Sequence, residues 1–171
     1  MTSDLAFHAC QRAMQAAGLK PAFVQGQRVT DEATVQVVER VLSQEINPEI
    51  VKTINELGGK ARGFSGTEIF TCRKFWPAGA GGEKLDIGFV GEVTAVNTEP
   101  LRECIRRGIT PVISPTARGE DGRLYNCNAD VAAARTAIAL KAKRLVFMSD
   151  VHGLMRNPED PATVISHLQA N

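Results

Sequence analysis

The sequence predicts an α/β fold in which a largely parallel central sheet is covered by helices. Segments with apolar residues at helical spacing alternate with short apolar runs along the second half of the chain. The run LVFM at residues 145–148 is uninterrupted, as expected of a central parallel strand buried on both faces. With 171 residues, 43% of them hydrophobic, the chain can form one domain with a substantial core.

The first third of the chain is predicted to be helical. Apolar residues recur at steps of three and four over residues 7–17, and Gly18 follows where a C-terminal cap belongs. Thr30 is expected to cap a second helix. Asn47, followed by Pro48, is a start signal for a third helix, which Gly58 would end.

The remaining elements are predicted from short β-like runs, turn residues and helical spacing. Residues 60–75 and 87–93 are expected to form an antiparallel hairpin with a loose, glycine-rich tip. The elements expected after it are a helix ending at Gly108, a strand at 110–114, a turn at 119–122, a helix at 129–142 and the strand at 145–148.

Composition and charge exclude several classes of protein. The formal net charge is +1 with scattered basic residues, which does not suggest a nucleic-acid or anionic-membrane partner. No apolar run approaches the length of a membrane span, and the first residues do not resemble a secretory signal. The four cysteines form no CxxC pair, so they are expected to be reduced core residues of a cytoplasmic protein.

The most informative motif is the segment leading into the predicted helix at 129–142. Asn126, Asn128 and Asp130 stand at every second position, so an extended chain would project them to one side, toward a polar ligand. The alternative is structural: Asn128 caps the helix and Asp130 complements its dipole. That alternative leaves Asn126 unexplained.

Two further stretches could bind ligands. Ser149 and Asp150 follow the predicted strand at 145–148, and ligands of open α/β sheets lie beyond the carboxyl ends of strands. An Asp-initiated turn explains them equally well. Arg28, just before a helix start, could clamp a carboxylate, although a solvated surface arginine is the commoner case.

Other patterns are weak. The GGK at residues 58–60 lacks the Ser or Thr of a phosphate loop, and the glycines at 79–82 do not precede a helix. The three histidines have no evident Ser or Cys partner in sequence, which disfavours hydrolase chemistry.

Taken together, four motifs resemble the N-acetylglutamate kinases of the amino-acid kinase family in order and spacing. They are GQRVTD at 26–31, GFVGEV at 88–93, NCNAD at 126–130 and SDVHGL at 149–154. The combination is specific, whereas any one of the four is not, and the resemblance covers essentially the whole chain.

The resemblance implies a three-layer sandwich with a β-hairpin lid over residues 87–93. It implies a single partial domain, with an acetylglutamate-binding part at about 1–115 and the start of an ATP-binding part at about 116–171. The implied activity is phosphorylation of the γ-carboxylate of N-acetyl-L-glutamate by ATP, with magnesium carried by the nucleotide, in arginine biosynthesis. The complete enzyme is expected to be a homo-oligomer.

The resemblance also assigns roles to residues. Arg28 would bind a carboxylate of the substrate, Asn126 would contact acetylglutamate, and Asn128 would assist. Asp130 would organise the catalytic lysines. The ATP site would be lined by Asp150, Val151, His152, Gly153, Leu154 and Met155.

The family pattern also has segments that this sequence does not contain. The lysine and glycine loops expected before residue 7, and a later lysine, are not found, so turnover would require cations that cannot be located here. Two alternatives therefore stay open. One is an amino-acid kinase acting on another acid or on a nucleoside monophosphate. The other is a non-catalytic module that binds an amino acid or a nucleotide.

Overall fold

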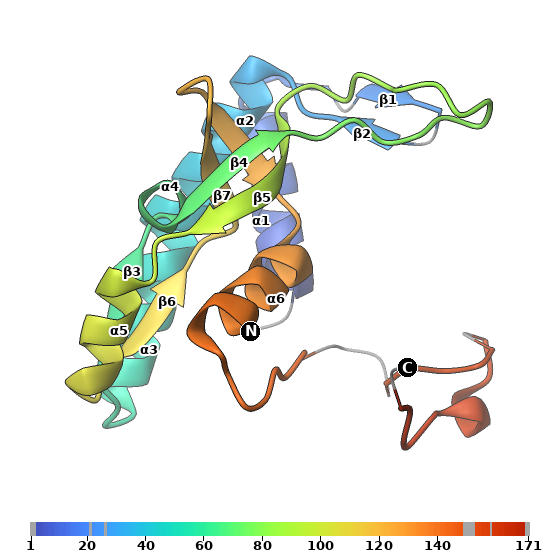
Figure 1. Cartoon of the computed structure of the whole chain (residues 1–171). Helices are drawn as coiled ribbons and strands as arrows, with labels where there is room; N and C mark the ends of the chain where they lie inside the picture. Colours follow the sequence, from blue (N-terminus) through green and yellow to red (C-terminus); the bar gives the residue numbers. More distant parts are fainter. Residues whose placement is uncertain (1–2, 21, 26, 149–152, 158, 170–171) are drawn as a thin grey trace.

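The computed structural model describes residues 3–20, 22–25, 27–148, 153–157 and 159–169 (Figure 1). Its elements, in chain order, are α1 (Ser3–Ala16), β1 (Ala22–Val24), β2 (Gln27–Val29), α2 (Glu32–Glu39), the π-helix η1 (Arg40–Ile46), α3 (Asn47–Glu56), β3 (Ala61–Phe64), α4 (Gly66–Ile69), β4 (Phe70–Lys74), β5 (Val90–Val96), α5 (Glu99–Arg106), β6 (Thr110–Ile113), β7 (Thr116–Gly119), β8 (Leu124–Cys127), α6 (Ala129–Leu140) and the 3₁₀ turn η2 (Pro161–Thr163).

The strands form three separate groups. Strands β1 and β2 form a hairpin, β3 and β6 form a parallel pair, and β4, β5, β8 and β7 close into a small barrel. The α/β prediction is confirmed, but the described strands form no single, largely parallel central sheet. The pairs β3–β6, β4–β7 and β5–β8 are parallel, whereas β1–β2, β4–β5 and β7–β8 are antiparallel. Within β7–β8 the reason is local: a tight turn can join only antiparallel neighbours.

Several predicted helices are confirmed, together with their ends. Gly18, Gly58 and Gly108 follow α1, α3 and α5 and have φ values of 70°, 85° and 66°. The N–H of Leu19 donates to the carbonyl of Met14 over 2.9 Å, which closes the C-terminus of α1 as glycine caps commonly do.

Two predicted helix starts are corrected. Asp31, not Thr30, caps α2, because its carboxylate accepts the N–H of Thr34 over 2.7 Å. Hydrogen bonds from the hydroxyl and from the backbone N–H of Thr34 lower the pKa of Asp31. Asn47 caps nothing, because α2 runs through η1 into α3 without leaving helical geometry.

Asn47 instead holds the parallel pair together. Its buried side-chain amide donates to the carbonyl of Phe64 at the end of β3 over 3.2 Å and to the carbonyl of Val112 in β6 over 2.9 Å. The amide thus adds one hydrogen bond to each strand, and the carbonyl of Phe64 also accepts the N–H of Ser114 over 3.3 Å.

The main core lies between the barrel and helices α5 and α6. Its most completely buried members include Ile69, Cys72, Val93, Leu101 and Ala117, each no more than 1% exposed. A second cluster joins α1 to η1. All four cysteines are buried and free, as predicted.

The predicted strand at 145–148 is wrong. These residues have no regular structure, and their exposed fractions run from 42% for Leu145 to 81% for Met148. No strand within the described ranges pairs with them. A continuous apolar run becomes a central strand only when neighbouring strands accept its hydrogen bonds, so the sequence pattern alone was insufficient.

The predicted hairpin of residues 60–75 and 87–93 is confirmed in part, because β4 and β5 pair antiparallel. The first half of the longer segment is corrected: β3 pairs in parallel with β6, and α4 follows it. The long connection between these strands lies beside the β1–β2 hairpin (Figure 1). Gln25 joins the two: its amide nitrogen donates to Glu83 over 2.7 Å, and its amide oxygen accepts the N–H of Ala80 over 3.1 Å.

Candidate functional site

A cavity of about 450 Å³ lies where β5 and β8 meet the connection after β4. Its wall is partly apolar, through Val90, Val93 and Val131. Two residues predicted from the sequence, Asn126 and Asn128, also line it. The cavity therefore combines short aliphatic side chains with amide hydrogen-bonding groups, a common composition for small-molecule sites.

Asn126 is held in place by its backbone. It lies in β8, opposite Val90 of β5 and Thr116 of β7, and its N–H donates to the carbonyl of Phe89 over 2.9 Å. Its half-buried side-chain amide forms no hydrogen bond with any residue in the described ranges. An amide at a cavity wall with both donor and acceptor unused is well suited to bind a polar ligand.

Asn128 has the structural role that the sequence offered as the alternative. Its side-chain oxygen accepts the N–H of Val131 over 3.0 Å and caps α6. Because the cap uses only the oxygen, the amide nitrogen keeps its two donors.

Asp130 does not join these amides in the cavity wall. It lies exposed in the first turn of α6. The predicted convergence assumed an extended chain, but the helix starts at Ala129, and successive helical residues turn by about 100° rather than alternating.

Arg28 lies in β2, where its backbone pairs with Phe23. Its side chain is outside the described part of the structure, so carboxylate binding by Arg28 stays a prediction.

The junction of Thr30 and Gly88 ties the end of β2 to the cavity rim. The N–H of Thr30 donates to Ile87 over 3.0 Å, and the carbonyl of Thr30 accepts the N–H of Phe89 over 2.7 Å. Gly88 has φ of 77°, and a Cβ there would lie 2.1 Å from the carbonyl oxygen of Thr30. Only glycine fits this position, which fixes the rim.

Glu92 is a cavity residue to which sequence reasoning assigned no role. Its carboxylate lies 2.9 Å from Arg73 and 3.9 Å from Arg135. Neither arginine is among the residues that line the cavity, so the two pairings offset the charge of the one carboxylate in the described lining. Arg73 is the cross-strand partner of Glu92, so a correct hairpin register would have revealed the pair.

Two buried thiols lie behind the cavity wall. The thiol of Cys127 donates a hydrogen bond to Cys72, and this bond together with burial raises the pKa of Cys127. Gly91 of β5 makes room for the pair, because a Cβ there would lie 2.7 Å from the Cys72 sulfur. Both thiols thus belong to the packing of the barrel.

The predicted ATP segment is described only in part. Asp150, Val151 and His152 lie outside the described residues. Leu154 is exposed, and Met155 forms an isolated antiparallel bridge with Val164. Gly153, Leu154 and Met155 are not among the residues that line the cavity, so the ATP assignment stays a prediction.

The described residues contain no group of three or more His, Cys, Asp or Glu side chains placed to hold a metal ion. Among the helices of these residues, none is long and apolar enough to cross a membrane.

Relatives with similar sequences carry a consistent name. The chain is 45% identical to an acetylglutamate kinase of Archaeoglobus fulgidus over 91% of its own length and 56% of that protein. It is 46% identical to an acetylglutamate kinase of Heliobacterium modesticaldum, over 89% of this chain and 54% of that protein. The chain thus spans about half the length of these curated relatives.

Solved structures agree on the fold. The crystal structure of smu.665 from Streptococcus mutans UA159 matches with a TM-score of 0.73 at 21% identity, over 87% of this chain and 59% of that one. The N-acetylglutamate synthase of Neisseria gonorrhoeae, solved with coenzyme A and N-acetyl-glutamate, matches with a TM-score of 0.63 at 25% identity, over 88% of this chain and 34% of that one.

The family model that matches is described as the amino acid kinase family, and it covers residues 6–171. A match over nearly the whole chain, together with the similarity to acetylglutamate kinases, decides the classification. The chain belongs to the amino acid kinase family.

Proposed function

We propose that the cavity beside Asn126 binds N-acetyl-L-glutamate and that the chain forms the acetylglutamate-binding part of an acetylglutamate kinase. The observation that carries the proposal is the uncommitted amide of Asn126 beside the donors of Asn128. The reaction would be transfer of a phosphoryl group from ATP to the γ-carboxylate, with magnesium carried by the nucleotide, in arginine biosynthesis.

The chemistry of the ligand suits the wall. N-acetylglutamate offers a neutral amide, two carboxylates and a short aliphatic chain. Asn126 and Asn128 would donate to its oxygen atoms, and Val90 and Val131 would contact its methyl and methylene groups. The predicted carboxylate clamp at Arg28 would favour the dianion, and the pairing of Glu92 with Arg73 and Arg135 would reduce the repulsion between Glu92 and the ligand.

A kinase that acts on a carboxylate needs no general base, because the nucleophile is already ionised at neutral pH. It needs in-line positioning and positive charge around the moving phosphoryl group. Asp130, exposed at the start of α6, would organise the lysines that supply this charge, and residues 150–155 would bind ATP. Because the chain spans about half of its relatives, turnover is proposed for a complete kinase, which we expect to be a homo-oligomer.

A non-catalytic module that binds an amino acid or a nucleotide is the second candidate. A kinase for a different acid is the third, and ligand competition would separate it from the others.

Calorimetric titration of the purified chain with N-acetyl-L-glutamate tests the proposal. We expect saturable binding that Asn126→Ala weakens by roughly 10- to 100-fold, since a hydrogen bond to a charged group contributes about 1.5–3 kcal/mol. Asn97→Ala is the matched control, because Asn97 is an exposed asparagine that does not line this cavity.

Unchanged affinity in Asn126→Ala would overturn the assignment of the cavity. Coupled ADP release with ATP and magnesium, measured on a complete kinase that contains this chain and on its Asp130→Ala variant, then separates the candidates. Turnover lost in the variant supports the kinase, whereas binding without turnover supports the module.

A further inference from the structure

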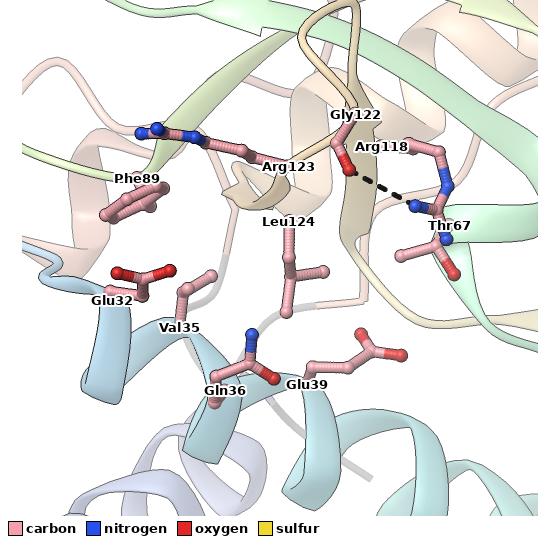
Figure 2. A pocket seen from close by; sticks show the side chains of 10 residues that line it. All are labelled: Glu32, Val35, Gln36, Glu39, Thr67, Phe89, Arg118, Gly122, Arg123 and Leu124. Carbon is pink, nitrogen blue, oxygen red and sulfur yellow. Dashed lines mark hydrogen bonds between the residues drawn. The ribbon is translucent and has the colours of Figure 1, made fainter.

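A second cavity, of about 430 Å³, lies between helix α2 and the hairpin of β7 and β8 (Figure 2). It shares no lining residue with the cavity beside Asn126. Nothing in the proposed function uses it, so its chemistry has to be explained separately.

The two walls of this cleft carry opposite charges. Arg118 and Arg123 come from the hairpin, and Glu32 and Glu39 come from α2 (Figure 2). Within the described ranges, no ion pair joins either arginine to either glutamate.

The arginines have only weak partners of their own. Arg118 donates to the carbonyl of Gly122 over 3.2 Å, and the Arg123 guanidinium lies 5.9 Å from the centre of the Phe89 ring. Arg123 also interacts electrostatically with the carboxylate of Asp121. Arg118 has no ion-pair partner among the described residues, so its guanidinium group is the one available to an anionic group.

Glu39 supplies an independent sign that a donor is missing. One carboxylate oxygen accepts the Ser65 hydroxyl over 2.7 Å. The other oxygen is buried and has no hydrogen-bond partner among the described residues. Buried carboxylate oxygens are normally paired, because an unpaired one loses its hydration without compensation. An ammonium group is the donor that would compensate it best.

Apolar side chains lie beside the charged groups. Val35 is 1% exposed at the base of the cleft, and Leu124 lies between the α2 residues and Arg123 in Figure 2. The walls therefore present an anion site at Arg118 and a cation site at Glu39, with an aliphatic surface next to them.

We propose that this cleft binds a small zwitterion of the α-amino acid class. The carboxylate of the ligand contacts Arg118, its ammonium group contacts Glu39, and its side chain lies against Leu124 and Val35. A simple anion or a simple cation would leave one of the two charged walls uncompensated, so a ligand with both charges fits best.

Titration of the whole chain with L-leucine tests this, because leucine combines the zwitterion with an aliphatic side chain. Isocaproate and isoamylamine are the matched probes that lack the ammonium group and the carboxylate, respectively. We expect leucine to bind with a dissociation constant of about 1 mM or tighter, as suits an open, solvated cleft, and each probe to bind at least about tenfold more weakly.

Two variants locate the site. Arg118→Gln and Glu39→Gln should each weaken leucine binding by about tenfold or more. Glu39→Gln keeps an acceptor for Ser65, and circular dichroism checks that each variant is folded. Arg107→Gln is the surface control and should leave binding unchanged, because Arg107 pairs with Glu103 at the end of α5 and does not line this cleft.

Failure of this proposal can be distinguished from failure of the proposed function, because different residues line the two cavities. Asn126→Ala should leave leucine binding intact, because Asn126 does not line this cleft. The proposal is overturned by the absence of leucine binding up to about 10 mM, by binding that either folded variant retains in full, or by a single-charge probe that binds as well as leucine.

Discussion

The barrel and the segment after α6 contain similar apolar residues in very different environments. In the barrel, Cys72, Val93 and Ala117 are no more than 1% exposed, and each lies in a strand with neighbours on both sides. In the later segment, the run from Leu145 to Met148 is at least 42% exposed throughout. The comparison teaches that an apolar run gains stability from the strands that pair with it, not from its composition.

The largest test of this comparison truncates one leucine in the core and one valine in the exposed run. Leu101→Ala should cost about 2–5 kcal/mol in the free energy of unfolding, because Leu101 is 0% exposed and packs against the barrel. Val146→Ala should change it by no more than about 0.5 kcal/mol, since Val146 is 75% exposed. Urea unfolding followed by circular dichroism measures both, and equal costs would break the comparison.

A second test asks whether a buried polar side chain contributes more to stability than an exposed one, as is expected for apolar side chains. Asn47→Ala removes the donor shared by the carbonyls of Phe64 and Val112 and should cost about 1–3 kcal/mol in unfolding free energy. The exposed Asn97→Ala should cost much less. If the denaturation midpoints of the parent and Asn47→Ala agreed within error, the bridge between β3 and β6 would contribute nothing to stability.

A smaller effect should appear at high pH. Burial and the hydrogen bond to Asp121 raise the pKa of Tyr125 from 10.0 to about 12. The unfolded chain therefore ionises this hydroxyl first. Its contribution to stability is complete below pH 10 and is lost as the pH rises toward about 12.

Tyr125→Phe is the control for this pH dependence. Tyr125 is the only tyrosine in the sequence, so phenolate absorbance reports its titration directly. The difference in unfolding free energy between the parent and Tyr125→Phe should shrink from pH 10 upward. A difference that stays constant to pH 12 would show that the buried hydroxyl keeps its ordinary pKa.

The sequence predicted those parts of the fold that depend on local spacing and caps. Helices α1, α5 and α6 and the β4–β5 hairpin were found in this way, and Asn128 was recognised as a possible cap. The failures depend on distant partners. Asn47 looked like a cap, because the two carbonyls it binds lie in strands that are remote in sequence.

The candidate sites follow the same rule. Asn126 and Asn128 were predicted from their close spacing in the sequence, and both line the same cavity. Glu92 and its arginines required the hairpin register, and the facing charges of Glu39 and Arg118 required the packing of α2 against the β7–β8 hairpin. No local pattern carries that information.

The link between Gln25 and the connection after β4 constrains how the length of this loop can vary. Surface loops usually tolerate insertions and deletions. Here Gln25 contacts both Ala80 and Glu83, and Thr30 holds the loop again at Gly88. A deletion between these anchors would pull Glu83 away from its partner, so the loop and the β1–β2 hairpin should change length together among descendants of this sequence.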